Sequence, residues 1–479
     1  MKKIKYIIIL TILISGTTLK AQEKLTLQQC RKMALQKNED LKMAGKQFEK
    51  AKTEKAAAKT LRLPKISASG TGIYLNKDFE QELTLPTQKP NPQTGELEPN
   101  YRINPATGQP VMGPDGNPVF NMYAWLPLTV SLKGTYLASV MLEQPIYTGG
   151  KINAGNEMAK IGVEMADENI GFQRMNAIAE TDRAYWNYIS VNEKVKLAGE
   201  AVDLLNEIVE VARNSYEVGM VHKNELLKAQ VEYNNATLDL QQAQNGLELS
   251  RMNLCRIIGL PLNASVVALD TLIEVEKPEL ISAEGFVTER PEYRLLEKNI
   301  RLQDENIRLT KADFLPTAGL QAGYSYLGGL DVGGDAISNS GLNVMASLKI
   351  PIFHWGEGVK KINAAKIDKE ITELKLEKNK QLLQLEIEQA RLNLKVSYQR
   401  IQMSEKALQQ AGENLRVTRD NYEVGMETLS ELLMAQTNWQ EAFSHLIDAK
   451  TDFKLKETAW LKATGRLSFS PADSKSDGE

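Results

Sequence analysis

Histidine, cysteine and closely spaced acidic residues are the side chains of this 479-residue chain that could carry enzymatic or metal chemistry. The chain has three histidines and two cysteines, too few for a His/Cys metal cage or a disulfide framework. His222, His354 and His445 lie in separate contexts and form no triad with a serine or cysteine signature. Cys30 and Cys255 read as small packed residues. We therefore predict no catalytic residue, no metal ligand, no cofactor and no enzymatic activity.

One glycine-rich segment has the composition of an ion-binding loop. Asp331–Asp335 (DVGGD) occurs once and lies between two predicted strands, where a turn needs the same residues. We therefore interpret it as a turn. The 58 Lys and Arg residues face 61 Asp and Glu residues, so no basic excess exists to hold phosphate backbones. Nucleic acid is excluded as a partner on that ground.

The N-terminal segment 1–21 has the order of a secretory signal. Lysines at positions 2, 3 and 5 precede an apolar run from Tyr6 to Ile14, and Ala21 suits the last signal position. The run is too short to span a bilayer comfortably, which disfavours a membrane anchor as the alternative. We predict a signal peptide at residues 1–21 and an exported mature chain.

The mature chain repeats itself. Residues 213–220 (RNSYEVGM) return at 419–426 (RDNYEVGM), and the same shift of 206 positions relates 145–161 to 351–367. One shift that holds over both of these stretches and the chain between them indicates duplication. Upstream the shift becomes 252, because the first half carries an insertion that is rich in proline. The predicted organisation is a first repeat at 22–260, a second at 261–465, and a C-terminal tail at 466–479.

Long helical hairpins are predicted in both halves. No proline occurs between Pro145 and Pro261, or between Pro351 and Pro471, and proline costs about 3 kcal/mol inside a helix. Within these gaps large apolar residues recur every seven positions, which predicts left-handed coiled coils. The expected hairpins cover about 153–257 and about 358–463. The heptad positions are Leu226, Tyr233, Leu240, Leu247 and Leu254, and Leu432, Trp439, Leu446, Phe453 and Trp460.

Segments with a period of two precede both hairpins. Strands are expected at about 65–79, 130–147, 316–328 and 341–354, each with one apolar and one polar face. Residues 80–127 are expected to form a long irregular inserted loop. Four strands cannot close a barrel, and an open edge cannot face lipid, so outward-facing apolar strands need partner copies. A soluble sandwich is the alternative for these strands alone. Tyr136, Tyr147, Phe353 and Trp355 lie near strand ends, as membrane-interface aromatics would.

At this point the sequence resembles the TolC-type outer membrane factors, also called outer membrane efflux proteins. The resemblance covers nearly the whole mature chain. It is carried by Leu25-Thr26-Leu27, the two YEVGM tips, the strand ends QPIY and IPIF, and Ile258–Pro261. It implies an α+β membrane protein: a homotrimer whose 12-stranded outer-membrane barrel, four strands per protomer, continues into an α-helical coiled-coil tunnel across the periplasm. It also implies a passive duct fed by an inner-membrane pump of the RND, ABC or MFS type through a periplasmic adaptor (membrane fusion protein).

The resemblance also implies two sites. Adaptor hairpins are expected to dock at the tips, which here are Val218, Gly219 and Met220, and Val424, Gly425 and Met426; the alternative is that the glycines merely make the turns. Acidic residues after the second tip narrow the tunnel in this family. Glu431 matches that pattern, Met434 departs from it, and Glu225 is the first-half counterpart of Glu431. Converging Glu431 carboxylates would favour cations. A solvated surface glutamate is the alternative for each. The alternative for the whole protein is a soluble periplasmic coiled-coil scaffold or adaptor.

Overall fold

The computed structural model describes residues 23–270, 275–278 and 285–467. The predicted signal peptide and residues 468–479 of the predicted tail lie outside these ranges. The chain divides into two compact units. The strand unit comprises Ala57–Asn156 and Arg308–Ile362. The helical unit comprises Glu157–Ile307 and the described parts of Met1–Ala56 and Asn363–Glu479.

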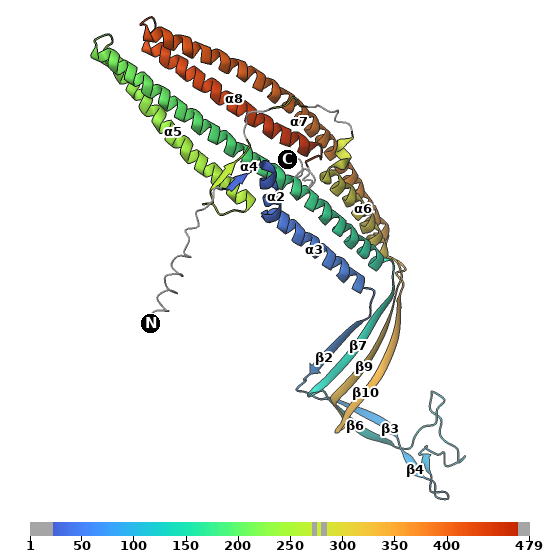
Figure 1. The fold of residues 1–479 in the computed structure, drawn as a ribbon. Coiled ribbons are helices and arrows are strands. Elements are labelled where there is room, and N and C mark those ends of the chain that lie inside the picture. Colours follow the sequence, from blue (N-terminus) through green and yellow to red (C-terminus); the bar gives the residue numbers. More distant parts are fainter. Residues whose placement is uncertain (1–22, 271–274, 279–284, 468–479) are drawn as a thin grey trace, which may run out of the picture. The chain divides into compact units, whose positions relative to one another are not determined.

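Four long antiparallel strands form the body of the strand unit. They are β2 (Lys65–Ile73), β7 (Thr135–Thr148), β9 (Thr317–Val332) and β10 (Asp335–Lys349), and they lie side by side in that order (Figure 1). Residues that pair across the strands form rows, and successive rows alternate between apolar and small polar residues, because side chains alternate between the two faces of the sheet. An apolar row contains Ala68, Val140, Tyr324 and Leu342, and the next row contains Ser69, Ser139, Ser325 and Gly341.

The strand bounds differ from the expected ones for local reasons. β9 runs to Val332 because Gly333 and Gly334, with φ of 69° and 94°, make a two-residue hairpin turn. β10 ends at Lys349 rather than 354, since Pro351 has no N–H to donate to a neighbouring strand.

The prediction of an irregular loop over 80–127 is wrong at both ends of the segment. This segment carries β3 (Phe79–Pro86), which pairs with β6 (Tyr123–Ser131), and β6 joins the edge of β9 through Val130↔Val332. The sheet therefore has six strands in the described chain, not four. The prolines in this segment argue against strands only if each backbone N–H is needed for pairing. In a two-stranded ribbon, proline can occupy outward-facing positions where the missing N–H breaks no hydrogen bond between strands. Two short strands, β4 (Gln88–Pro90) and β5 (Leu97–Pro99), pair beyond the ribbon.

Two long hairpins dominate the helical unit, where they lie side by side (Figure 1). The first is α4 (Lys151–Glu217) and α5 (Lys223–Ile258), and the second is α7 (Glu357–Glu423) and α8 (Leu429–Ala463). The outer bounds of both hairpins lie close to those expected from the sequence. Helices α4 and α7 have 67 residues each. No helix in the described ranges is long and apolar enough to cross a membrane.

Heptad residues of the second hairpin form much of the core. Leu432, Leu446, Phe453 and Trp460 are buried, and Trp439 packs against the buried cluster that contains Tyr185. In the first hairpin Leu254 is fully buried, while Leu226, Tyr233 and Leu247 pack at the borders of buried clusters. The hairpins are therefore held together by the apolar stripes that the seven-residue spacing creates.

Several shorter elements complete the helical unit and were not foreseen. A capping box at Thr26 starts α2 (Leu27–Lys37), and Pro291 occupies the first position of α6 (Pro291–Ala312). Helix α3 (Glu39–Thr60) has 22 residues, like α6, and the starts of the two helices lie 252 positions apart in the sequence. The remaining elements are β1 (Glu23–Leu25), which pairs with β8 (Val266–Ala268), and a short 3-10 helix at Phe286–Glu289.

Candidate functional site

Each hairpin turns at a glycine in the left-handed region. Gly219 and Gly425 have φ of 77° and 79°. At the first tip the Met220 N–H donates to the Ser215 carbonyl at 2.8 Å, and the Met426 N–H donates to the Asn421 carbonyl at 2.9 Å. These bonds close the ends of α4 and α7 with the geometry that glycine adopts most readily. Both glycines therefore have a structural role, whatever else the tips do.

The side chains beside these glycines are exposed and apolar. Met220 is 76% exposed and Met426 is 77% exposed, and Val218 and Val424 are exposed as well. Nothing in the turn geometry requires a large apolar residue at these positions. The two hairpins therefore present equivalent exposed apolar residues at their tips.

Glu431 has a structural partner that the sequence reading did not foresee. Thr428 caps α8 and accepts from the Glu431 N–H at 3.2 Å, while the Thr428 N–H donates back to the Glu431 carboxylate at 3.4 Å. The Glu427 side chain lies beside this carboxylate. The Glu427 side chain lowers the pKa of Glu431, and the Thr428 backbone N–H lowers it further by a smaller amount. Glu431 in turn raises the pKa of Glu427. A second acid thus lies before Glu431 along the chain, although Met434 departs from the acidic pattern after it.

Glu225 lies in the first turn of α5, which begins after His222 without a side-chain cap. Its charge acts on Tyr422 of the second hairpin. Burial raises the pKa of the Tyr422 hydroxyl, and the Glu225 charge raises it further. That hydroxyl is buried and has no hydrogen-bond partner within the described part of the chain. Residues far apart in the chain give no local sequence signal that they lie close together, so Tyr422 was not predicted as part of this site.

The tip ends of the two hairpins are packed together. Leu226 of α5 and Leu429 of α8 belong to one apolar cluster. An ion pair of 2.9 Å joins Arg419 of α7 to Glu207 of α4. Glu225 and Glu431 are therefore presented by two hairpins that form one packed end of the helical unit.

The four predicted interface aromatics are all exposed in the strand unit. Tyr136 is the second residue of β7, and its ring centroid lies 5.8 Å from that of Tyr326, while Tyr147 lies at the opposite end of β7. Phe353 and Trp355 follow β10, with ring centroids 4.9 Å apart. The four aromatics therefore lie near both ends of the long strands.

The remaining candidates for chemistry are structural. Asp331 accepts from the Gly334 N–H at 2.9 Å and so stabilises the turn between β9 and β10. His222 precedes α5, His354 contacts Phe314 edge to face, and His445 lies within α8. Within the described ranges, no group of three or more His, Cys, Asp or Glu residues could hold a metal ion.

Comparisons with known proteins agree with this architecture. The sequence model of the family described as outer membrane efflux protein matches residues 121–260 and 287–466. The outer membrane protein TolC of Vibrio cholerae is 22% identical over 321 residues, covering 65% of this chain and 73% of that protein. The alkaline protease secretion protein AprF of Pseudomonas aeruginosa is 22% identical over 338 residues, covering 68% of each chain.

The fold matches that of solved outer membrane channels. The CmeC channel of Campylobacter jejuni superimposes with a TM-score of 0.69 at 20% identity, covering 94% of this chain and 88% of that chain. The family match alone spans well over half of the sequence, including both hairpins and the long strands apart from β2. The chain belongs to the outer membrane efflux protein family.

Proposed function

We propose that three copies of this chain close one channel in the outer membrane. The observation that carries the proposal is the sheet: one face is apolar and exposed, and the outermost long strands β2 and β10 each pair with a single neighbour. An unpaired strand edge cannot face lipid, because its N–H and C=O groups would lack partners. Pairing β2 of one copy with β10 of the next satisfies both edges. Four long strands from each of three copies give a barrel of twelve.

Matching helix spacings support a duplicated protomer. Helix α4 begins at Lys151 and α7 at Glu357, while α5 begins at Lys223 and α8 at Leu429. Both pairs of starts are related by the same shift that relates the two YEVGM tips. With this duplication, three copies supply six equivalent hairpins to the tunnel wall. A nearly six-fold arrangement of similar hairpins can close into a cylinder although the assembly has only three chains.

Two rows of exposed apolar residues on the outer helices of the hairpins support assembly. One row on α5 and one on α7 each repeat at every eleventh position, so successive members return to within about 20° of the same helix face. Leu238 of α5 is 57% exposed and Leu385 of α7 is 63% exposed. We infer that α5 of one copy packs against α7 of the next. The rows are Leu227, Leu238 and Leu249, and Leu374, Leu385 and Val396.

Leu385→Asp is expected to prevent stable assembly without unfolding the protomer. The residue is exposed in the single chain, so folding should change by less than about 0.5 kcal/mol, whereas three carboxylates would be buried in the trimer. Size-exclusion chromatography with light scattering in detergent measures the outcome. Gln384→Asp introduces the same charge at an exposed neighbour outside the row and serves as the control. A Leu385→Asp protein that remains fully trimeric would contradict this packing.

The protein is a passive exit duct of a tripartite efflux or type I secretion system, not an enzyme. Outer membrane location and the channel role follow from the family and from the exposed apolar sheet. An inner-membrane pump supplies the energy, and a periplasmic adaptor docks on the tips at Val218–Met220 and Val424–Met426. A soluble periplasmic scaffold would not need a sheet with an exposed apolar face, which argues against that alternative.

Glu431 and Glu225 narrow and polarise the tunnel end in this proposal. Glu431→Gln retains the capping box, because glutamine serves as well as glutamate at that position, but it removes the charge. We expect Mg²⁺ block of the channel to weaken by about tenfold in planar bilayers, since a ring of carboxylates is a cation site. Glu413→Gln, a surface change at a residue paired with Arg416, should leave block unchanged. Equal block in all three proteins would remove Glu431 from the gate.

A further inference from the structure

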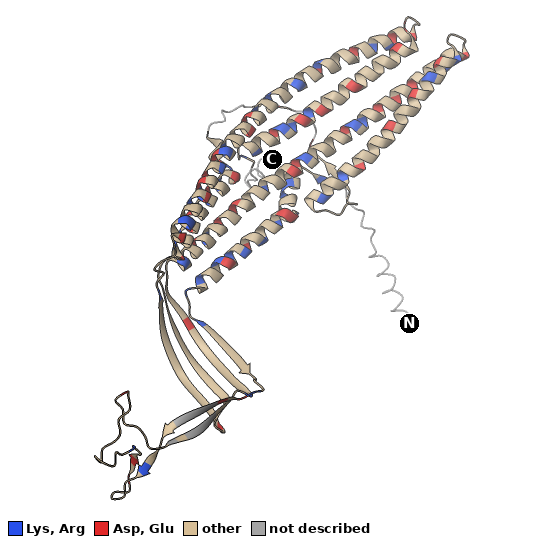
Figure 2. Cartoon of the chain, turned by 180° about the vertical axis from the view of Figure 1, so that it is seen from behind, with Lys and Arg blue, Asp and Glu red and all other residues tan. Residues whose placement is uncertain are grey.

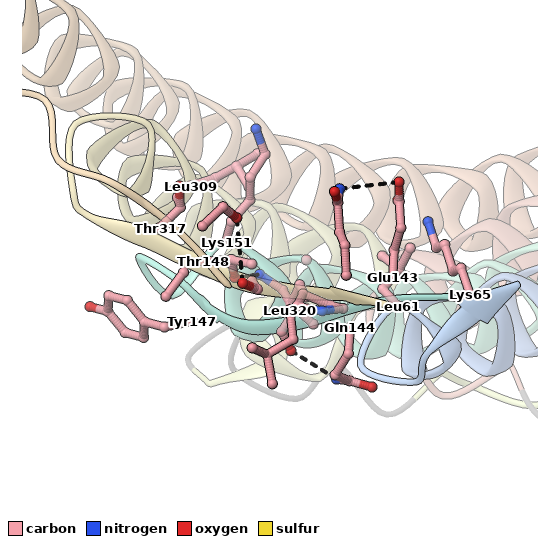
Figure 3. A pocket seen from close by; sticks show the side chains of 17 residues that line it. Leu61, Lys65, Glu143, Gln144, Tyr147, Thr148, Lys151, Leu309, Thr317 and Leu320 are labelled. Atoms are coloured by element: carbon pink, nitrogen blue, oxygen red, sulfur yellow. Dashed lines mark hydrogen bonds between the residues drawn. The ribbon is translucent and has the colours of Figure 1, made fainter. Parts of the chain in front are cut away.

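Away from the β9–β10 turn, the long strands of the sheet carry charge only at the end from which the chain continues into the helices. Lys65 of β2 lies opposite Glu143 of β7, and Glu143 lies opposite Gln321 of β9, so the three share one row. The Gln321 side-chain amide donates to the Glu143 carboxylate at 3.4 Å. Figure 3 shows Lys65 and Glu143 directed to the same side of the sheet, and Gln144 directed to the other. This row lies at the end of the strands from which the chain continues into α4.

Lys349 belongs to the same face. It pairs with Thr317, and Met345, four positions earlier on β10, pairs with Gln321. Residues two or four apart on a strand share a face, so Lys349 projects to the side of Lys65 and Glu143. No register shift interrupts β10 between Met345 and Lys349. Lys349 is the last residue of β10, and Lys65 is the first residue of β2, so both lie at the helix end of the sheet.

Apart from Asp331 and Asp335 at the β9–β10 turn, these three residues are the only charged ones in the four long strands. The segments 65–73, 135–143, 317–327 and 341–349 contain Lys65, Lys349 and Glu143, and every other residue in them is uncharged. The strands are correspondingly almost free of charge in Figure 2, in contrast to the helices. The balance is 2 − 1 = +1 per chain. The sign of the electrostatic field at this end of the sheet therefore depends on two lysines and one glutamate.

Both lysines are accessible, and Lys65 faces an open pocket. Lys65, Glu143 and Gln321 line a pocket of about 550 Å³, which Thr148, Ser347 and Leu309 also line (Figure 3). Lys65 and Lys349 are exposed, and each belongs to a strand with one unpaired edge. Closure of the sheet edges between copies would bring β10 of one copy beside β2 of the next. The two lysines would then line the same seam.

We propose that Lys65 and Lys349 form a basic ring at the helix end of the barrel, which favours anionic solutes and disfavours cations. The inference rests on the proposed trimer, in which the ring would carry a net charge of 3 × (+1) = +3. Rings of charged side chains set the ion selectivity of pores, and at 0.1 M salt the field of the ring extends about 10 Å into the lumen. The channel would then carry acidic residues at the tunnel end and basic residues at the helix end of the barrel, and both positions would affect ion selectivity.

Reversal potentials in planar bilayers under a KCl gradient test the ring. The double variant Lys65→Gln/Lys349→Gln leaves only Glu143, so the net charge of three copies becomes −3. The ratio of chloride to potassium permeability should fall by about three- to tenfold, and the change should shrink near 1 M salt, where the Debye length is about 3 Å. Glu143→Gln should shift the ratio in the opposite direction. Lys65→Arg/Lys349→Arg should keep wild-type selectivity, because the charge is retained.

Lys46→Gln/Lys50→Gln is the matched control, since it also removes two positive charges per chain. Both lysines are exposed on α3 and paired with Glu49 and Glu54. Equal shifts of the permeability ratio in this control and in Lys65→Gln/Lys349→Gln would overturn the basic ring. So would the lack of an opposite shift in Glu143→Gln. Neither result would contradict the channel itself. A wild-type trimer without any conductance would instead overturn the proposed function and the ring with it.

Discussion

Replacing Asp182 by alanine is expected to lower the free energy of unfolding by about 3–5 kcal/mol. Asp182 is fully buried, and its carboxylate accepts two hydrogen bonds of 2.6 Å from the Arg31 guanidinium. It also accepts one of 2.8 Å from the Thr458 hydroxyl. The carboxylate thereby joins α2, α4 and α8. Its removal would leave the Arg31 side chain, only 14% exposed, without its counter-ion.

Urea unfolding followed by circular dichroism in detergent measures this loss. Glu180→Ala is the matched control, because Glu180 lies close to Asp182 on α4 and pairs with Arg256 at an exposed position. Exposed pairs contribute about 0–1 kcal/mol, so the control should lose less than about 1 kcal/mol. Thr458→Val replaces the hydroxyl by a methyl group, which removes the hydrogen bond to Asp182, and is expected to cost about 1 kcal/mol. Similar losses in Asp182→Ala and Glu180→Ala would show that the buried network is not what holds α2 in place.

The second large effect is expected at the hairpin tips. Met220→Asp together with Met426→Asp should abolish capture of the periplasmic adaptor while the trimer stays intact. Burying a methionine contributes about 1.5–3 kcal/mol, and a buried unpaired carboxylate adds a penalty. In a trimer the two substitutions alter six tips. Both residues are more than three-quarters exposed, so folding should be nearly unaffected.

Cross-linking in the native cell, followed by purification of the channel and identification of the adaptor by mass spectrometry, measures this effect. Met112→Asp, at an exposed methionine of the strand unit, controls for the chemistry of the change and should retain the adaptor. Undiminished adaptor recovery from a trimeric tip variant would contradict docking at the tips. The turn itself is not altered, because Gly219 and Gly425 are retained.

The long helices were predictable because their determinants are local. Proline is excluded from helix interiors, and a seven-residue spacing of large apolar residues sets one face of each helix. Phe453 and Trp460 are buried where that spacing requires burial. The paired segment 79–131 was not predictable in the same way. Its prolines weigh against strands in a local reading, and only the pairing partners decide at which positions a missing N–H is harmless.

The candidate sites also differ in whether a local sequence pattern marks them. The tips were found because glycine marks a left-handed turn, and two copies of YEVGM mark it twice. The capping box around Thr428 has a local signature that the sequence reading overlooked, since Glu431 follows threonine at the third position. The approach of Tyr422 to Glu225 joins two positions that are far apart in the sequence. No local pattern predicts it, because it depends on how two hairpins pack.

Native mass spectrometry of the protein extracted from the outer membrane tests the central proposal most directly. Three copies of the mature chain are expected in one complex, because β2 and β10 provide one pair of edges per copy and twelve long strands close the barrel. A trimer recovered from the outer membrane fraction is the predicted result. A monomer or dimer recovered from the soluble periplasmic fraction would contradict the proposal.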